Sequence, residues 1–305
     1  MKNRVVFFGD SNSYISTILF KKFLKNLSES FELVAVVNTA PNNKNNKIKS
    51  FIVFGVKKLF NPFDKNIKYR SYENFLTIVN SDIKLIESEN INDLEFIKSI
   101  KSVKPDFAFL IGCPQIFKKN LIECFDKVIN YHNSYLPTYR GLEATSWAMT
   151  YKEKYSGYTF HYVNEKIDDG KIVLQEKIEI DYSKSSYENE LIKTKEAGKN
   201  MSRLFDLVFS NFEGYSQVGN QSYFGIKQKE KLSTFEKIDD IQMIQRLIRI
   251  WGGVKLLSNN ETIFVTKIAD DGKIKRIKWL PPKTYTILNF FKSLLSNNRI
   301  NDAKY

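Results

Sequence analysis

The first forty residues alternate between strand-like and helix-like patterns, and this alternation constrains the fold more than any other feature. Residues Arg4 to Phe8 are largely apolar, and residues 13–27 then place apolar side chains at helical spacing. Residues 32–38 follow as a second apolar strand. A strand, a helix and a strand in this order favour two parallel strands joined by a crossover helix. The sequence therefore predicts a Rossmann-like, doubly wound α/β domain with a mostly parallel sheet.

The turn after the first strand contains one glycine, Gly9. A dinucleotide-binding turn needs the G-x-G-x-x-G pattern, which lets the backbone approach the pyrophosphate, so a cofactor such as NAD is not expected here. The small polar residues Asp10, Ser11 and Asn12 are candidates for contacts with an acceptor substrate at the N-terminus of the following helix. An ordinary turn is the alternative.

Further strands are predicted at residues 83–86, 106–111 and 128–132, and a helix capped by Asn92 or Asp93 precedes the second of them. Residues 106–111 are apolar throughout, as a central parallel strand should be. In a doubly wound sheet the ends of the first strand and of strands 106–111 and 128–132 meet where the strand order reverses, and ligands bind there. Residues 51–80 have no clean periodicity, and no structure is predicted for them.

Both histidines of the chain lie between residues 128 and 170. Asn130 and His132 are two residues apart on a predicted strand, so their side chains share one face. Imidazole titrates near neutral pH and an amide donates a fixed hydrogen bond, a combination suited to proton transfer with oxyanion stabilisation. Residues 157–163 form another predicted strand, with His161 on it, and a polar loop containing Asp168 and Asp169 follows. Each feature alone also fits a structural histidine or a turn.

These motifs occur in a specific order: Asn-x-His-x-Ser-x-Leu-Pro at 130–137, Arg140-Gly141, Gly-x-Thr-x-His at 157–161 and Asp-x-Gly at 168–170. Together they resemble the formyltransferases that use 10-formyltetrahydrofolate. The resemblance covers residues 105–180 well, the N-terminal hundred in outline and the C-terminal third weakly. It implies that Asn130, His132 and Asp168 are the catalytic residues.

The resemblance also implies that the segment after strand 106–111 and the 164–168 loop hold the pterin through backbone groups and apolar walls. The expected folate contacts are Gln115, Ile116, Phe117, Asn164 and Glu165. The expected acceptor contacts are Asp10, Ser11, Asn12, Ser134, Arg140 and His161. For Ile116 and Phe117, ordinary core packing is the alternative.

The composition fits a globular protein, because 42% of the 305 residues are hydrophobic and 24 are phenylalanine. The two cysteines have no paired spacing, and no signal sequence or membrane-spanning run is apparent, so a cytoplasmic location without membrane insertion is expected. Two histidines provide no familiar metal-binding spacing, and no metal is expected. A net charge of +13 favours phosphate-bearing partners, or else marks a solvated surface.

The chain is expected to divide into a catalytic domain at 1–210, a linker at 211–236 and a small α+β domain at 237–305. Ser185 and Glu188 form a capping-box pattern that opens a helix running to about Phe209. The small domain should hold a helix, a three-stranded meander and a last amphipathic helix. The meander is expected to expose four apolar side chains, which would pair with a second subunit in a homodimer or dock on the first domain. These side chains are Val265, Ile268, Ile274 and Ile277.

The resemblance gives the reaction, while the acceptor depends on weaker features. The favoured acceptor is the amino group of a nucleotide-linked deoxyamino sugar, with dTDP as the favoured carrier, in surface polysaccharide biosynthesis such as that of lipopolysaccharide. A methionyl-tRNA formyltransferase normally carries a five-stranded C-terminal barrel, for which this chain offers too few strands. The lysines of residues 39–58 support the tRNA alternative, since they could follow an RNA backbone. A non-catalytic folate or nucleotide-sugar binding protein is the third alternative, but it would be expected to lose a member of the triad.

Overall fold

The computed structural model describes residues 2–41, 75–225 and 228–278, the last range with gaps at 229–231, 233, 236, 238 and 259–260. The chain divides into two compact units, Met1–Phe224 (unit 1) and Gly225–Tyr305 (unit 2). Within the described ranges, no helix combines the length and the apolar character that a bilayer crossing requires. The active-site motifs all lie in unit 1.

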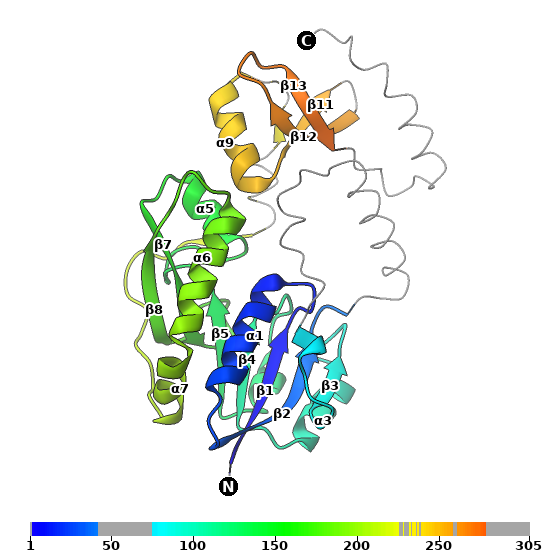
Figure 1. Cartoon of the computed structure of the whole chain (residues 1–305), viewed down its shortest axis with the longest axis vertical. Helices are drawn as coiled ribbons and strands as arrows, with labels where there is room; N and C mark the ends of the chain where they lie inside the picture. The colour runs from blue at the N-terminus through cyan, green and yellow to red at the C-terminus, as the bar shows by residue number, and fades with distance from the viewer. Residues whose placement is uncertain are drawn as a thin grey trace, which may run out of the picture. The chain divides into compact units, whose positions relative to one another are not determined.

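Unit 1 is built on a seven-stranded sheet in the order β3-β2-β1-β4-β5-β7-β8 (Figure 1). The strands are β1 (Asn3–Gly9), β2 (Phe31–Asn38), β3 (Lys84–Glu87), β4 (Phe107–Ile111), β5 (Lys127–His132), β7 (Tyr155–Tyr162) and β8 (Ile172–Glu179). The first five strands in the sheet order are parallel, and β7 and β8 continue the sheet in antiparallel fashion. The predicted α/β fold with a mostly parallel sheet is confirmed.

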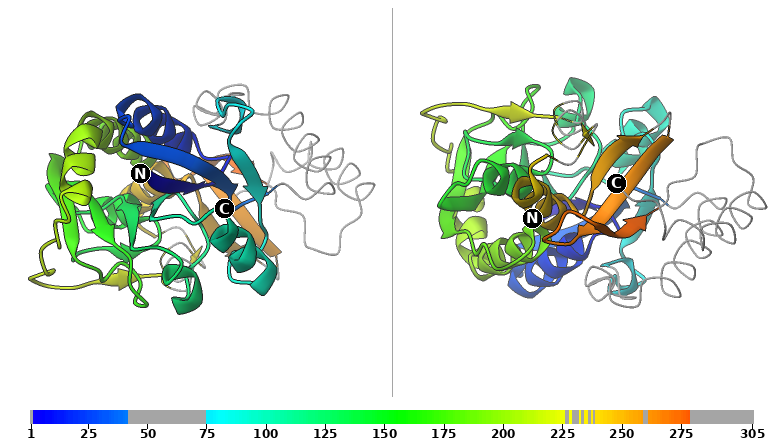
Figure 2. Two further views of the ribbon diagram at one scale, coloured as in Figure 1. Left: turned by 90° about the horizontal axis from the view of Figure 1, so that it is seen from below. Right: turned by 90° about the horizontal axis from the view of Figure 1, so that it is seen from above.

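Helices cover both faces of this sheet, and Figure 2 shows α1 and α3 on opposite sides of it. The helices and single turns of unit 1 are α1 (Tyr14–Asn26), η2 (Phe75–Thr77), α3 (Leu94–Ser102), α4 (Lys119–Ile122), α5 (Ala144–Thr150), α6 (Ser186–Lys199) and α7 (Met201–Phe209). The core is correspondingly split in two. Phe7 of β1 packs on the α1 side, with its ring centroid 4.5 Å from that of Phe20. Phe8 faces the other layer, 4.9 Å from Phe117. Burial on both faces explains why β1 is apolar throughout.

The N-terminus of α1 is fixed at the end of β4. Ser13 caps the helix by accepting a hydrogen bond from the amide of Ser16, and the hydroxyl of Ser16 donates to the carbonyl oxygen of Ile111 at 2.7 Å. Gly112 follows with φ +67°, and a Cβ there would lie 2.7 Å from Ser16 Oγ. Only glycine fits this turn without displacing the helix. The ends of β1 and β4 are therefore held beside the start of α1.

The capping box predicted at Ser185 and Glu188 is confirmed, but the helix that it opens is divided. The helix predicted to reach Phe209 breaks at Asn200 into α6 and α7. The side chain of Asn200 donates to Tyr158 Oη at 2.9 Å and to Glu176 Oε1 at 3.2 Å. These contacts with β7 and β8 explain the break, because they tie the amide side chain to the sheet.

Residues 211–224, called the strap below, belong to unit 1, although they were predicted as the first part of a linker at 211–236. Tyr215 and Ile172 exchange two backbone hydrogen bonds, at 2.7 and 2.8 Å. Strand β9 (Tyr223–Phe224) pairs in parallel with β6 (Arg140–Gly141). The composition of the strap resembles that of a linker, but its backbone is hydrogen-bonded to the catalytic unit.

Unit 2 contains α9 (Ile241–Trp251) and a four-stranded sheet in the order β10-β11-β12-β13. The strands are β10 (Thr234–Phe235), β11 (Val254–Ser258), β12 (Glu261–Ile268) and β13 (Ile274–Lys278). Strand β10 was not predicted. Val265 and Ile268 were expected to be exposed, and this is wrong: they pack with Ile244 and Leu247 of α9 in the core of unit 2. Ile274 is partly exposed, and the predicted last helix lies outside the described residues.

Candidate active site

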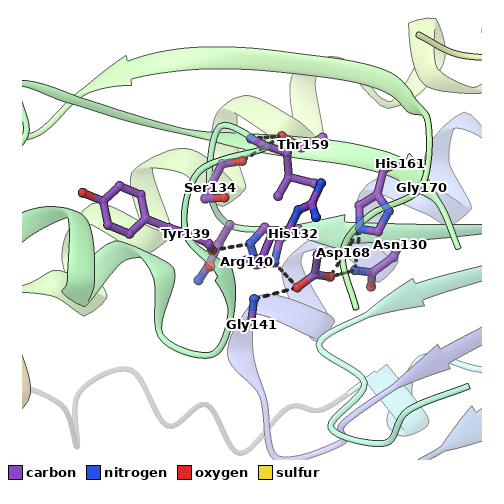
Figure 3. A network of polar contacts seen from close by, with 12 residues as sticks. Asn130, His132, Ser134, Tyr139, Arg140, Gly141, Thr159, His161, Asp168 and Gly170 are labelled. Carbon is purple, nitrogen blue, oxygen red and sulfur yellow. Dashed lines mark hydrogen bonds and ion pairs between the residues drawn. The ribbon is translucent and has the colours of Figure 1, made fainter. Parts of the chain in front are cut away.

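The candidate site is centred on the carboxyl end of β5, which carries Asn130 and ends at His132. Strand β7 runs antiparallel beside it, and the register places His161 opposite Asn130. The loop between β7 and β8 brings Asp168 to the same place. Figure 3 shows the side chains of these four residues converging on one another. Two strands and one loop thus assemble a cluster of one amide, two imidazoles and one carboxylate.

Asp168 is held by groups on three sides. Its Oδ2 accepts a hydrogen bond from the amide of Gly141 at 2.8 Å and lies 3.6 Å from His132 Nδ1. Its Oδ1 lies 3.5 Å from both Asn130 Nδ2 and His161 Nε2. The residue has φ +50°, a conformation uncommon for residues other than glycine and one that needs support from its surroundings. The carboxylate is therefore oriented mainly by the Gly141 amide.

His132 is buried, and its two ring nitrogens have different partners. Nε2 lies 2.9 Å from the carbonyl oxygen of Tyr139, which can only accept, so Nε2 carries a hydrogen and donates it. In the neutral ring Nδ1 is then unprotonated and faces Asp168 at an ion-pair distance rather than a hydrogen-bond distance. Protonation of Nδ1 would create an imidazolium directly beside a carboxylate. His132 is thus arranged to take up a proton at Nδ1.

The surroundings shift the pKa values of both groups. Burial lowers the pKa of His132, and the carboxylate of Asp168 opposes this shift. Burial alone would raise the pKa of Asp168, but His132, His161 and the Gly141 amide together bring it well below its ordinary value. At neutral pH the site therefore contains an ionised Asp168 and a neutral His132, which is the state that a proton acceptor needs.

His161 was expected to contact the acceptor, but it is 98% buried among the candidate catalytic groups. Its Nδ1 lies 2.8 Å from the carbonyl oxygen of Tyr162 and must donate, so Nε2 accepts. Asn130 Nδ2 lies 3.1 Å from that Nε2 and supplies the hydrogen. His161 thereby fixes which way the Asn130 amide points. Its position became apparent only from the pairing of β5 with β7.

Arg140 is also drawn into the site, as an ion pair with the neighbour of Asp168. Its Nη1 lies 2.6 Å from Asp169 Oδ1, and its Nη2 donates to Gln217 Oε1 at 2.6 Å. Its Nε is buried and has no hydrogen-bond partner among the described residues. Gln217 lies in the strap, far from Arg140 in sequence. Nothing in the sequence indicated that the strap contacts this site.

The residues predicted to contact folate lie in different settings. Gln115 joins backbone groups, since its amide donates to the carbonyl oxygens of Thr39 and Ser88 and accepts from Ile91. Phe117 belongs to the core beside Phe8, which was the alternative considered for it. Ile116 is 61% exposed. Asn164 and Glu165 are exposed in the loop before Asp168.

The predicted acceptor contacts at the N-terminus form a turn stabilised from within. Asp10 Oδ1 accepts from the backbone amide of Asn12 at 2.8 Å, and the amide of Ser11 donates to Asn38 Oδ1 at 3.2 Å. Ser134 is fully buried and donates to the carbonyl oxygen of Thr138 at 2.6 Å. Ser134 therefore shapes the loop after His132, and its hydroxyl does not face solvent.

A buried polar cluster behind His132 was not anticipated from the sequence. Lys193 of α6 donates to the carbonyl oxygen of Asn133, to Thr145 Oγ1 at 2.6 Å and to Ser156 Oγ at 3.1 Å. The side-chain amide of Asn133 donates to Glu190, one turn earlier on α6. Both ends of Asn133 are thus held by one helix. The signal was faint, because a lysine in an amphipathic helix is usually solvated.

The chain belongs to the formyl transferase family, whose profile matches residues 3–203. The family resemblance inferred from the motifs is confirmed. Methionyl-tRNA formyltransferase of Thermodesulfovibrio yellowstonii is 28% identical over 181 residues, which cover 59% of this chain and 51% of that protein. The bifunctional polymyxin resistance protein ArnA of Wigglesworthia glossinidia brevipalpis is 36% identical over 110 residues, 34% of this chain and 17% of that protein. The chain spans about half the length of the first of these relatives.

Solved structures share the fold. A sugar N-formyltransferase from a Shewanella species has a TM-score of 0.59 at 20% identity and covers 88% of this chain and 98% of its own. A 4-N formyltransferase from Francisella tularensis has a TM-score of 0.59 at 17% identity, covering 90% and 99%. Methionyl-tRNA formyltransferase from Clostridium thermocellum has a TM-score of 0.55 at 14% identity, covering 92% and 100%. At these identities the likeness concerns the fold, and the acceptor must be argued separately.

Proposed function

We propose that this protein transfers a formyl group from 10-formyltetrahydrofolate to an amine, with Asn130, His132 and Asp168 as the catalytic residues. The observation that carries the proposal is the convergence of these side chains at the carboxyl edge of the sheet, with Asp168 anchored by the Gly141 amide. Membership of the formyl transferase family supports the reaction class. Among the described residues, no group of three or more histidine, cysteine, aspartate or glutamate side chains is placed so that it could hold a metal ion.

In the proposed mechanism the acceptor amine attacks the formyl carbon and the carbonyl oxygen becomes an oxyanion. Asn130 Nδ2 donates to that oxygen. This hydrogen bond replaces the longer of the two contacts that Nδ2 makes, the one with Asp168 Oδ1 at 3.5 Å. His132 accepts the proton that the amine loses, at Nδ1, and the Asp168 carboxylate stabilises the imidazolium. The bond between the formyl carbon and N10 of the folate then breaks, and the proton passes to N10. Formylated amine and tetrahydrofolate are the products.

Apolar side chains near this site fit a folate ring system. Ile116 follows β4, Leu142 follows β6 and Ile167 precedes Asp168, and all three are exposed, at 61%, 52% and 40%. Exposed apolar side chains on segments that adjoin a catalytic cluster are typical of a ligand-binding surface. They support a flat heterocycle bound beside the triad, with the loop at 164–168 forming one wall.

For the acceptor we propose a nucleotide-linked deoxyamino sugar, with dTDP as the carrier and surface polysaccharide biosynthesis as the context. The sheet in the described part of unit 2 has four strands, packed on helix α9, and this small α+β arrangement supports a small acceptor. The sugar N-formyltransferase and the 4-N formyltransferase described above align over 98% and 99% of their own length, but the methionyl-tRNA formyltransferase aligns over 100% of its own, so these alignments do not separate the two acceptors.

Methionyl-tRNA is the second candidate acceptor, because curated relatives of this chain carry that name. The basic segment that favoured this acceptor lies largely outside the described residues. Formyl transfer to RNA through many phosphate contacts would weaken steeply as salt increases. Transfer to a nucleotide sugar, with few phosphates, would change little over the same range.

The test is to incubate the full chain with 10-formyltetrahydrofolate and, separately, with a panel of nucleotide-linked amino sugars and with methionyl-tRNA. Mass spectrometry then identifies the acceptor that gains one formyl group, and each active pair is assayed at low and high salt. Transfer to a sugar nucleotide with weak salt dependence is the expected result. Transfer to methionyl-tRNA alone would overturn the sugar proposal, and transfer to none would overturn the activity.

A further inference from the structure

Gln217, a residue of the strap, forms hydrogen bonds with the loop that carries Asp168. Gln217 Nε2 donates to the carbonyl oxygen of Asp168 at 2.9 Å and to that of Gly170 at 2.8 Å. Its Oε1 accepts from Arg140 Nη2 at 2.6 Å. Both donor hydrogens and the acceptor oxygen of this amide are therefore used. The part of the chain that the family profile matches ends at residue 203, so Gln217 lies outside the matched region.

The strap is itself held at the strand that supplies the other anchor of Asp168. β9 pairs with β6, so the strap meets Arg140 and Gly141, and the amide of Gly141 donates to the carboxylate. Gly141 has φ +91°, and a Cβ there would lie 2.4 Å from the carbonyl oxygen of Phe224. Glycine is required for this approach. The strap thus contacts the backbone of Asp168 directly through Gln217, and it pairs with the strand whose Gly141 amide binds the side chain of Asp168.

Besides Gln217 and the Gly141 amide, the main contact of the loop is the ion pair of Asp169 with Arg140, and Arg140 is itself bound to Gln217. Residues 164–167 are exposed, while Asp168 adopts a conformation with φ +50° that costs free energy unless neighbouring groups enforce it. The carboxylate also lies beyond hydrogen-bond distance of His132, so that contact cannot fix the loop. A small displacement of such a loop changes the distance between carboxylate and imidazole directly.

We propose that Gln217 is a positioning residue that sets the backbone of Asp168 and thereby the placement of its carboxylate against His132. The inference rests on the catalytic role proposed for Asp168. The strap is then part of the active site, although its composition is that of a linker. A glutamine suits the position because the same side chain must donate twice and accept once.

Two variants separate the contacts of Gln217. Gln217→Met keeps the length but removes all three hydrogen bonds, while Gln217→Glu keeps an acceptor for Arg140 and loses both donors. We expect each to lower kcat by about 10- to 100-fold, with the KM of either substrate changed less than about threefold. Val218→Ser is the matched control, because Val218 is the next residue of the strap and is 85% exposed. It should leave kcat unchanged.

A second readout needs no substrate. The chain has two histidines, so selective ¹⁵N labelling resolves both imidazoles and allows each to be titrated. The charged and titratable groups that act on His132 are Asp168, His161 and Lys193, together with the Tyr139 carbonyl. A displaced Asp168 stabilises the imidazolium less, so Gln217→Met, which adds no charge, should lower the pKa of His132. Asp168→Asn should lower it further, and Val218→Ser should not change it.

The outcomes distinguish this inference from the proposed function. If wild-type protein transfers no formyl group but Gln217→Met shifts the pKa of His132 as expected, the positioning role stands and the activity does not. If transfer is robust while neither Gln217 variant alters kcat or the His132 titration, the inference is overturned. In the double variant Gln217→Met with Asp168→Asn, kcat should equal that of Asp168→Asn alone; a multiplied loss would show that Gln217 acts elsewhere.

Discussion

Two histidines occupy one cluster, yet their surroundings give them different tasks. His161 is locked by the Tyr162 carbonyl into the form that accepts from Asn130, so its lone pair is already used. His132 donates to the Tyr139 carbonyl through Nε2 and keeps Nδ1 open toward Asp168. Only His132 is therefore arranged to exchange a proton, and His161 fixes the direction of the amide.

Replacement of Asn130 by alanine should lower kcat strongly with little effect on KM. The proposed hydrogen bond to the oxyanion forms only as charge develops, so its loss affects the transition state more than the bound substrate. Removal of one such donor costs about 100- to 1,000-fold in kcat. Steady-state kinetics with both substrates, alongside the thermal unfolding midpoint, would check this. If kcat/KM fell by the same factor but the whole loss came from a higher KM, the assigned role would be contradicted.

The pH dependence of kcat/KM should reflect the protonation of His132. The neutral ring is the active form, so activity should fall as the pH decreases through the pKa of His132, which burial places below the ordinary value for histidine of about 6.5. Asp168→Asn removes the anion that favours the imidazolium, so this acid limb should move to still lower pH while the maximal rate decreases. The measurement is a pH-rate profile of both proteins. A limb that moves to higher pH would contradict the proposed coupling.

Sequence reasoning identified part of the site because local rules apply to it. The shared face of Asn130 and His132 follows from the period of a strand, and Asp168 came from the ordered motifs. The contributions of the Tyr139 carbonyl, the Gly141 amide and Gln217 could not be predicted. They depend on which strands pair and in which register, information that is non-local. For Phe117 the sequence left two interpretations open, a contact with folate or packing in the core, because an apolar side chain near the end of a strand fits both.

Whole elements also differ in whether local sequence rules predict them or whether they depend on contacts between distant residues. Strands β1 and β4 were readily predicted, because burial on both faces leaves a continuous apolar run. The break of the predicted long helix at Asn200 was not, since it arises from contacts with Tyr158 and Glu176 on other elements. The strap was predicted as part of a linker from its composition. Two of its polar side chains, those of Gln217 and Ser222, bind backbone groups of unit 1.

Helix α6 supports the loop after His132 through two residues on one of its faces, Lys193 and Glu190. Desolvation lowers the pKa of Lys193 and raises that of Glu190, and the charge of each opposes the shift of the other. Both bind Asn133, the residue next to His132. Lys193 and Glu190 hold the two ends of Asn133 and interact through their charges, so we expect the loss of either one to affect the other.

Lys193→Met should therefore destabilise unit 1, by about 3 to 5 kcal/mol, because it removes a buried ammonium that donates three hydrogen bonds and whose charge acts on Glu190. Adding Glu190→Gln should restore part of this loss by removing the unpaired charge. Urea denaturation of the wild type, of Lys193→Met, of Glu190→Gln and of the double variant gives the coupling energy directly. Lys195→Met, on the same helix but exposed, is the control and should change stability by less than about 0.5 kcal/mol. If the double variant were no more stable than Lys193→Met, the pairing would be refuted.

On the scale of the whole chain, each unit has its own core. The two large hydrophobic clusters are built from residues of unit 1, and the cluster around α9 is built from residues of unit 2. Val265 and Ile268, two of the four side chains on which a homodimer was predicted, are buried within unit 2, Ile274 is exposed, and the side chain of Ile277 lies outside the described part of the structure. The homodimer stays a prediction, and the mass of the protein in solution at micromolar concentration tests it.

This separation of cores predicts where unit 1 can be cut. A chain ended after Phe224 keeps the strap, and it should unfold in one cooperative transition with the His132 titration of the full chain. A chain ended after Ser210 loses Phe224, whose ring centroid lies 4.5 Å from that of Trp147, together with Tyr215 and Gln217. We expect the shorter chain to be less stable and to have a lower pKa at His132, because Asp168 loses its support. Chemical denaturation and histidine titration of the two fragments would show this. Equal behaviour of both fragments would mean that residues 211–224 serve only as a connection to unit 2.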